Sequence, residues 1–302
     1  EENIMRIYTN TAAMSTYTKY TAAANAKASA LEKLSSGSRI NSAADDAAGL
    51  AISNKMTAQI SGMKQARSNA QDGISLIQTA EGALEETGKM LNRMRDLALQ
   101  ASNGTLQGED RHEIALEMKT LFSNIDAISN NTKFNGMTLF GDSKNESLTF
   151  NFQVGANSGE VSSVVIKKMT TDKLGLATLS TEVNSIADAT DNASADAANK
   201  SFKAGSTFDT AVLGVLDDAI KKVSDQRAQL GAAQNGLTHT VNSLEATTTN
   251  LAAANSRIKD VDMAQEMTSY TSSNILLQAA TSMLSQANSM PQSVMTLLQN
   301  IG

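Results

Sequence analysis

The sequence contains no cysteine and no tryptophan, and it has a single proline, Pro291, among its 302 residues. The absence of cysteine excludes disulfides, thiol nucleophiles and cysteine-based metal sites together. Aromatic residues make up only 4 % of the chain, and so little bulk argues against a broad globular core. The composition therefore favours long, thin helical packing, in which Ala, Met and Leu suffice.

Charge and hydropathy narrow the class further. No stretch of about 18 apolar residues exists, so no segment is predicted to span a membrane. The net charge of −6 comes without a Lys/Arg run or a basic stripe interleaved with aromatics, which argues against a nucleic-acid partner. The first 24 residues have no apolar signal-peptide core, so we expect no Sec route. The lack of cysteine is compatible with an extracellular location.

The residues that usually carry catalysis are sparse and scattered. The only two histidines, His112 and His239, lie far apart in predicted helices, and no HExxH motif is present. Asp45 and Asp46 are paired carboxylates, but no His, Lys or second carboxylate pair stands at a supporting spacing. We interpret the pair as structural. The sequence thus predicts no catalytic residue, no metal site, no cofactor and no enzyme activity.

Apolar residues at helical spacing mark three long segments. The longest covers 56–101 and ends at Asn103-Gly104, because glycine is a favoured C-terminal stop. A second helix is predicted over 114–128, and a third over 212–258.

Between these helices the period changes to two. Leu148 to Val154 alternate with polar residues, and 161–166 return after a glycine-containing turn, so a small β-hairpin is expected. Residues 171–207 are rich in Ala, Asp, Asn, Ser and Thr. They predict a loop or a short helical excursion of low packing density.

The last thirty residues form an unbroken heptad seam, the spacing of a helix that buries one narrow stripe against another helix. A weaker, smaller-residue seam near the N-terminus is the best partner in the sequence. The C-terminal seam consists of Leu276, Ala280, Met283, Ala287, Met290, Val294, Leu297 and Ile301. The N-terminal seam consists of Ile7, Met14, Tyr17, Thr21, Ala24, Ala28 and Leu31.

These patterns together predict a mainly α fold. It is a long antiparallel α-helical bundle or coiled coil with the N- and C-terminal segments paired, plus a small β-hairpin region. A second track on the terminal helix, Asn274, Thr281 and Asn288, is polar at every heptad step. We expect this track to line a water-filled channel in an assembly.

Seven motifs, in order along the chain, resemble bacterial flagellin. The resemblance covers roughly 1–170 and 206–302. The motifs are LEKLSSGSRINSAADDAAGLAIS (31–53), QDGISLIQTAEGAL (71–84), KMLNRMRDLALQASNGT (89–105), LTFNFQVGAN (148–157), GAAQNGLTHTVNSL (231–244), ANSRIKDVDMAQEM (254–267) and SMLSQANSMPQSV (282–294).

The resemblance implies a subunit that polymerises with itself into the flagellar filament used for swimming, with a minimal central region. The terminal helices would form an inner core and the next helices an outer core. The implied divisions are 1–45 and 259–302 for the inner core, 46–170 and 206–258 for the outer core, and 171–205 for a short variable surface segment.

Further partners follow from the resemblance alone. They are the flagellar cap and hook-junction proteins, a cytosolic export chaperone that grips roughly 262–302, and Toll-like receptor 5. The chain would be exported unfolded through the flagellar type III apparatus and reside in the extracellular filament. The receptor site is expected at Asn92, Arg93, Asp96, Leu97 and Gln100, with Leu97 as the apolar centre of one helix stripe that also contacts a neighbouring subunit.

Two alternatives stay open at this point. A hook–filament junction protein has similar terminal helices, but the QNGLTHT and LTFNFQVGAN motifs favour flagellin. A secreted coiled-coil adhesin would need a sizeable exposed binding domain, and 171–207 is short and featureless.

Overall fold

The computed structural model describes residues 10–141, 145–188 and 207–299, and for 207–211 and 291–299 it describes the backbone only. The described part is mainly α-helical with two small antiparallel sheets, which confirms the predicted fold class. The helices are α1 (Thr11–Ser36), α2 (Ala47–Ala101), α3 (Gly108–Asn131), α4 (Thr171–Leu174), α5 (Ala177–Ala187), α7 (Thr207–Lys259) and α8 (Met263–Gln299). The strands are β1 (Lys133–Phe134), β2 (Met137–Thr138), β3 (Ser147–Gln153) and β4 (Val161–Lys167).

The chain divides into two compact units, 1–60 with 249–302, and 61–248. The division falls inside α2 and α7, about ten to fifteen residues from the inner-core and outer-core limits that the resemblance implies. Within the first unit, Asn255 Nδ2 of α7 donates to Thr57 Oγ1 of α2 at 3.4 Å, so these two helix ends contact one another. Within the described ranges, no helix has an apolar run long enough to cross a bilayer.

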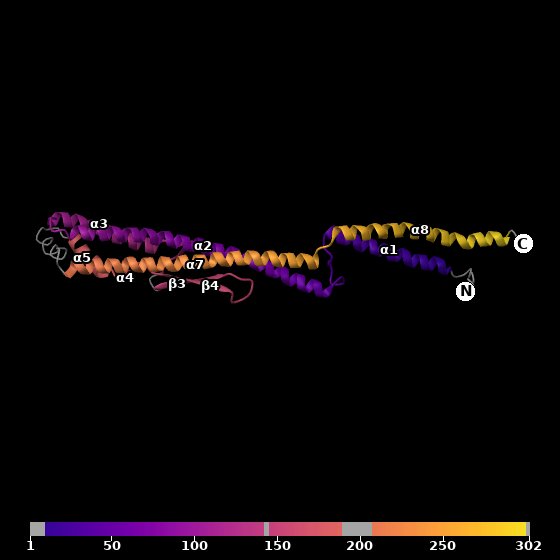
Figure 1. Ribbon diagram of the computed structural model, residues 1–302, viewed down its shortest axis with the longest axis horizontal. Helices are drawn as coiled ribbons and strands as arrows, with labels where there is room; N and C mark the ends of the chain where they lie inside the picture. Colours follow the sequence, from indigo (N-terminus) through magenta and orange to yellow (C-terminus); the bar gives the residue numbers. More distant parts are fainter. Residues whose placement is uncertain (1–9, 142–144, 189–206, 300–302) are drawn as a thin grey trace. The chain divides into compact units, whose positions relative to one another are not determined.

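In the first unit α1 and α8 run antiparallel, side by side (Figure 1). Asn10 begins α1 as its N-cap, accepting from the backbone N–H of Ala13 at 3.0 Å, and its Nδ2 donates to the carbonyl of Ala287. At the other end of α1, Gly37 has φ +68°, a left-handed cap that favours glycine. The carbonyl of Gly37 accepts from the N–H of Val261, so both ends of the pair are tied.

A short segment links α1 to α2 and is held by backbone bonds. The Arg39 N–H donates to the carbonyl of Lys259 at 2.6 Å, and its guanidinium donates to the carbonyl of Ile258 at 2.7 Å. Asp46 then caps α2 by accepting from the Gly49 N–H at 2.9 Å.

Asp45 organises the turn before this cap. Its carboxylate accepts from the backbone N–H of Ser42 at 2.8 Å and of Asn41 at 3.1 Å, and also from the Ser42 hydroxyl. These bonds, led by that of the Ser42 N–H, hold the pKa of Asp45 below its ordinary value. Asp45 and Asp46 therefore act as local structural groups, as interpreted from the sequence.

In the 61–248 unit, α2 and α7 pack antiparallel. Three ion pairs show the direction, since their positions rise along α2 and fall along α7. The pairs are Arg67–Glu245 (4.0 Å), Glu81–Arg227 (3.3 Å) and Arg95–Asp217 (2.7 Å).

The face of α2 predicted from periodicity is the buried face. Every predicted position from Met63 to Ala101 is buried, and Ile77, Leu84, Leu91 and Met94 are among the fully buried side chains of the core. The hairpin β3–β4 also forms as expected and packs on α2, where a Cβ at Gly73 would lie 3.1 Å from the ring of Phe152.

Residues 171–187 differ from the expectation of low packing density. Leu174, Leu179, Val183 and Ile186 are all buried in the same core as α2, α3 and α7. The polar composition of 171–207 as a whole hid four apolar side chains at helical spacing, which fill the space against α3. Residues 189–206, also covered by that expectation, lie outside the described residues.

Candidate assembly surface

The α1–α8 pair has almost no core of its own. The buried hydrophobic side chains described in its unit are Ala23, Ala30, Ile40 and Ala287. Alanine removes little apolar area from water, so the hydrophobic effect stabilises this pair weakly. A pair of helices with so small a core needs further packing partners to be stable.

Of the five predicted C-terminal seam positions whose side chains are described, two face α1. Ala287 is buried and Ala280 is half-buried, as expected. Leu276, Met283 and Met290 instead lie on an outer face, 58 %, 62 % and 47 % exposed. These three side chains are therefore not buried against α1, and their burial by further subunits stays a prediction.

The side chains that replace them stand one position further along the helix. Leu277 and Leu284 are half-buried on the α1 side of α8. Two apolar tracks run next to one another on this helix, and a seven-residue period alone does not say which one packs. Val294 and Leu297 lie in α8 but outside the described side chains, and Ile301 lies outside the described residues.

The N-terminal seam is shifted in the same way. Met14, Tyr17 and Leu31 are 64 %, 60 % and 54 % exposed, while Ala23 and Ala30 make the contact with α8. The other predicted members, Thr21 and Ala28, are exposed and Ala24 is half-buried, whereas Ile7 lies outside the described residues.

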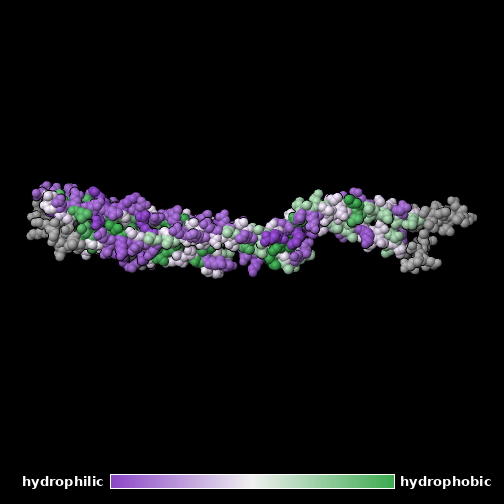
Figure 2. Space-filling view, in the orientation of Figure 1, coloured by the Kyte–Doolittle hydropathy of each residue, from purple (hydrophilic) through white to green (hydrophobic). Residues whose placement is uncertain are grey.

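The side chains left outside form what we call the outer apolar surface. Ten of the fourteen exposed large hydrophobic side chains in the described residues lie in this unit. White and green atoms predominate over α1 and α8 (Figure 2). The members are Met14, Tyr17, Leu31, Ile52, Met263, Met267, Ile275, Leu276, Met283 and Met290.

A shallow groove lies within this surface, between α1 and α8. It has a volume of about 530 Å³ and its walls differ in bulk. Small residues, including Ala22 and Ala26, line it from α1, and Leu276 and Met283 line it from α8. Large apolar side chains beside small ones provide the knobs and holes of helix packing.

Five threonine hydroxyl groups of α1 and α8 are bonded within their own helices. Each of the five donates to the carbonyl four residues earlier, at 2.8–2.9 Å, and so needs no partner from elsewhere. The groups are those of Thr16, Thr21, Thr268, Thr271 and Thr281.

The polar track proposed to line a channel divides between two environments. Thr281 and Asn288 are exposed. Asn274 is half-buried, and its Oδ1 accepts from Lys27 Nζ at 2.9 Å, so it belongs to the α1–α8 contact.

The predicted receptor stripe on α2 needs one correction. Asn92, Arg93, Asp96 and Gln100 are exposed, but Leu97 is only 1 % exposed and belongs to the core. Leu97 was predicted as the apolar centre of the stripe, but it lies on the inward face of α2 with Met94 and Ala98 and is not part of its exposed surface.

The contacts of this stripe are local. Arg93 Nε donates to Glu117 of α3 at 2.8 Å, and this bond raises the pKa of Arg93. The exposed apolar side chain nearby is Leu99, at 45 %.

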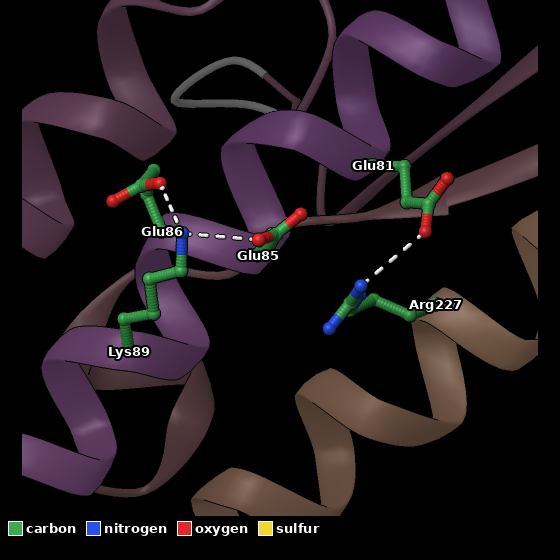
Figure 3. A network of polar contacts seen from close by, with 5 residues as sticks. All are labelled: Glu81, Glu85, Glu86, Lys89 and Arg227. Carbon is green, nitrogen blue, oxygen red and sulfur yellow. Dashed lines mark hydrogen bonds and ion pairs between the residues drawn. The ribbon is translucent and has the colours of Figure 1, made fainter.

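Figure 3 shows ion pairs of α2, two within the helix and one to α7. Lys89 Nζ lies 2.8 Å from Glu86 and 3.0 Å from Glu85, which raises the pKa of Lys89 and lowers that of Glu85. Glu81 pairs with Arg227 across the two helices. All five side chains are accessible to solvent, so these pairs contribute modestly to stability.

Arg111 is a structural residue that the sequence did not reveal. It is 8 % exposed, and its guanidinium donates to the carbonyls of Ala101 and Asn103 at 2.9 and 3.0 Å. It thereby bonds the carbonyl of the last residue of α2 and a carbonyl of the turn that follows. A basic residue shortly after a predicted helix end was the available signal.

Comparisons with known proteins agree along the chain. Residues 7–145 match the bacterial flagellin N-terminal helical region, and residues 213–298 match the bacterial flagellin C-terminal helical region. A flagellin of Bacillus subtilis is 48 % identical over 98 % of this chain and 100 % of its own length. A flagellar filament 33 kDa core protein of Treponema phagedenis is 44 % identical over 89 % of this chain and 91 % of its own.

A solved structure from Vibrio parahaemolyticus, described as a flagellar hook-associated protein, covers 72 % of this chain and 100 % of its own with a TM-score of 0.55. Its identity of 18 % shows a shared fold alone. The two matched regions and the identity to flagellins over nearly the whole length show that this chain belongs to the bacterial flagellin family, whose members are structural subunits of the flagellar filament and not enzymes.

Proposed function

We propose that this chain polymerises with copies of itself through the outer apolar surface, nine of whose ten side chains lie on α1 and α8. The observation that carries the proposal is the contrast within one unit: its buried core is almost entirely alanine, while ten large apolar side chains lie outside. Burying a half-exposed side chain of this size contributes about 1 kcal/mol, so ten contribute on the order of 10 kcal/mol per subunit. That amount is enough to drive association.

The test compares two substitutions on exposed positions of α8. Met283→Glu places a charge in the outer apolar surface, and we expect it to stop growth from filament seeds. Gln278→Glu adds the same charge at an exposed polar position and should grow as the parent chain does. Seeded growth is followed by light scattering and electron microscopy. Equal growth of both variants would contradict the proposal.

Within the polymer, Thr281 and Asn288 line the central channel. Uncharged polar groups there neither hold nor repel an unfolded chain in transit. Charged substitutions, Thr281→Lys and Asn288→Lys together, should slow filament growth in swimming cells while seeded growth in solution continues. A filament map with both side chains packed on apolar neighbours would contradict this placement.

Before assembly, the exposed apolar side chains of this surface need a binding partner in the cytosol, which supports an export chaperone that binds 262–302. The chain then passes unfolded through the flagellar type III apparatus. The cap and hook-junction proteins would meet this surface at the filament ends. Chaperone binding should be lost when 262–302 are deleted, as measured by calorimetry. Binding that survives the deletion would contradict the site.

As a monomer, the chain is a ligand of Toll-like receptor 5 through Asn92, Arg93, Asp96 and Gln100 on α2. Arginine is among the residues that most often anchor interfaces, so Arg93→Ala should reduce receptor activation on the order of tenfold. Arg95→Ala loses a matching exposed ion pair, that with Asp217, and is the control. If both variants reduce receptor activation equally, the cause is the lost ion pair between helices and not a lost contact with the receptor.

A further inference from the structure

Methionine supplies half of the outer apolar surface. Five of the ten side chains are methionines, each of them 47–64 % exposed, and four lie on α8. They are Met14, Met263, Met267, Met283 and Met290. Leucine has a similar volume and would bury a similar apolar area, so hydrophobicity alone does not require sulfur at these positions. The thioether adds chemical reactivity to the surface.

Most described methionines of the 61–248 unit are shielded from solvent. Met94 and Met118 are fully buried, and Met63 and Met169 are at most 7 % exposed. Met137 on β2 is an exception at 50 %. The chain therefore contains exposed methionines in the outer apolar surface, an exposed methionine outside it, and buried methionines in the core.

The sequence has no cysteine, so no thiol competes for an oxidant. A peroxide transfers one oxygen atom to a thioether: sulfur supplies the electron pair of the new S–O bond and the O–O bond breaks. With hydrogen peroxide, the second oxygen leaves as water after taking the proton of the transferred hydroxyl. Sulfur loses two electrons and the peroxide gains two. The oxidant must reach the sulfur, so exposure determines which methionines react.

Oxidation changes what these side chains need in a subunit contact. A sulfoxide oxygen accepts hydrogen bonds, and its burial without a donor is unfavourable. Met283 lines the groove beside Thr16, and Met267 lines a shallow hollow of α8 with Thr268 and Thr271. All three hydroxyl groups already donate to carbonyls of their own helices at 2.8–2.9 Å. These threonines therefore offer no free donor to a sulfoxide.

We propose that the five methionines of the outer apolar surface are an oxidative modification site: a peroxide converts them to sulfoxides in the free subunit, and the oxidised subunit does not polymerise. This inference rests on the assembly role proposed above for the same surface. Incorporated subunits are protected because their methionines are covered. The modification is reversible, since methionine sulfoxide reductases return the thioether and form water as two thiols become a disulfide.

The first measurement maps the reaction. The full chain, as monomer and as filament, is treated with hydrogen peroxide, and peptide mass spectrometry follows the gain of oxygen at each methionine. In the monomer, the five surface methionines and Met137 should react on the order of tenfold faster than Met94 and Met118. In the filament, the five should react on the order of tenfold more slowly than in the monomer. Equal rates in both forms would overturn the proposed assembly surface, and this inference with it.

The second measurement is seeded growth after oxidation. The oxidised parent chain should need a monomer concentration on the order of tenfold higher for growth. A five-leucine variant keeps the surface apolar without a thioether, and it should grow equally before and after peroxide treatment. Met137→Leu removes an exposed methionine outside the surface, and it should stay as sensitive as the parent. The five changes are Met14→Leu, Met263→Leu, Met267→Leu, Met283→Leu and Met290→Leu.

Two results would overturn the oxidation site while leaving the assembly surface intact: oxidised parent chain that grows as the untreated chain does, or a five-leucine variant as sensitive as the parent. Methionine sulfoxide reductases with dithiothreitol should restore growth of the oxidised parent. If the five-leucine variant fails to grow untreated, this recovery decides, and its absence would also overturn the inference.

Discussion

Replacing each of two glycines of α2 by alanine, and comparing the free energies of unfolding of the two variants, measures how tightly the β3–β4 hairpin packs on this helix. Gly82 is exposed and a Cβ there would have no neighbour within 4 Å. Gly73 is buried, and its Cβ would lie 3.1 Å from both Cγ and Cδ1 of Phe152. Both positions are helical, so alanine brings the same gain in helix propensity at each.

The expected changes in the free energy of unfolding have opposite signs. Gly82→Ala should stabilise the monomer by about 0.5–1 kcal/mol, because alanine loses less backbone entropy than glycine in a helix. Gly73→Ala brings the same gain but also an overpacking cost of about 1–3 kcal/mol as the Phe152 ring is displaced. The two variants should therefore differ by about 1–3 kcal/mol.

Urea unfolding of the monomer, followed by circular dichroism, provides the comparison. The double variant Gly73→Ala, Phe152→Leu should recover part of the loss, because the smaller side chain leaves room for the methyl group. If Gly73→Ala stabilises the chain as much as Gly82→Ala does, then the hairpin moves freely on α2 and the packing argument is wrong.

Three further changes test other parts of the fold. Arg111→Met should cost about 1.5–3 kcal/mol in urea unfolding, because it removes charged hydrogen bonds to the end of α2; a loss below about 0.5 kcal/mol would contradict that role. Leu179→Ala should cost about 2–5 kcal/mol, since Leu179 is 3 % exposed in the core, and a neutral result would mean that α5 is loosely attached. The N–H groups of Ser42 and Asn41 lower the pKa of Asp45 in the folded chain. The ionised carboxylate therefore contributes to the free energy of unfolding above the ordinary pKa of about 3.9, and this contribution is lost as pH falls through the lower folded pKa. Unfolding of the parent chain and of Asp45→Asn from pH 2.5 to 7 should therefore converge at the acid end, and a constant difference would refute the assignment.

The spacing of apolar residues in the sequence correctly predicted the helices and strands that bury one continuous face. The inward side of α2 follows from its apolar spacing from Met63 to Ala101, because a long helix in a bundle has one narrow face to bury. The strands of β3–β4 follow from strict alternation for the same reason. The β1–β2 hairpin was missed, although Asn135-Gly136, with φ of +49° and +81°, is the dipeptide typical of a tight hairpin turn.

The terminal seams show where a single sequence is insufficient. Leu276 and Leu277 are both apolar and adjacent, and a two-helix contact accommodates either track. A chain that packs only on itself would leave one track polar. Here both tracks are apolar, so the period was predicted correctly and the direction in which each stripe points was not. Leu97 presents the converse case, since the charged Arg93 and Asp96 stand near it in the sequence but its own position on the helix is inward.

The threonines of α1 and α8 make it easier to remove water from the surface of these helices. A hydroxyl that already donates to its own helix, as Thr271 does to Met267 at 2.8 Å, has little to lose when water is removed from around it. The same helix face is therefore wettable as a free chain and tolerant of a dry contact, with no rearrangement of its hydrogen bonds in between. Threonines of this kind tolerate both water and a dry interface. The free energy of burying the surface is therefore determined by its apolar residues alone.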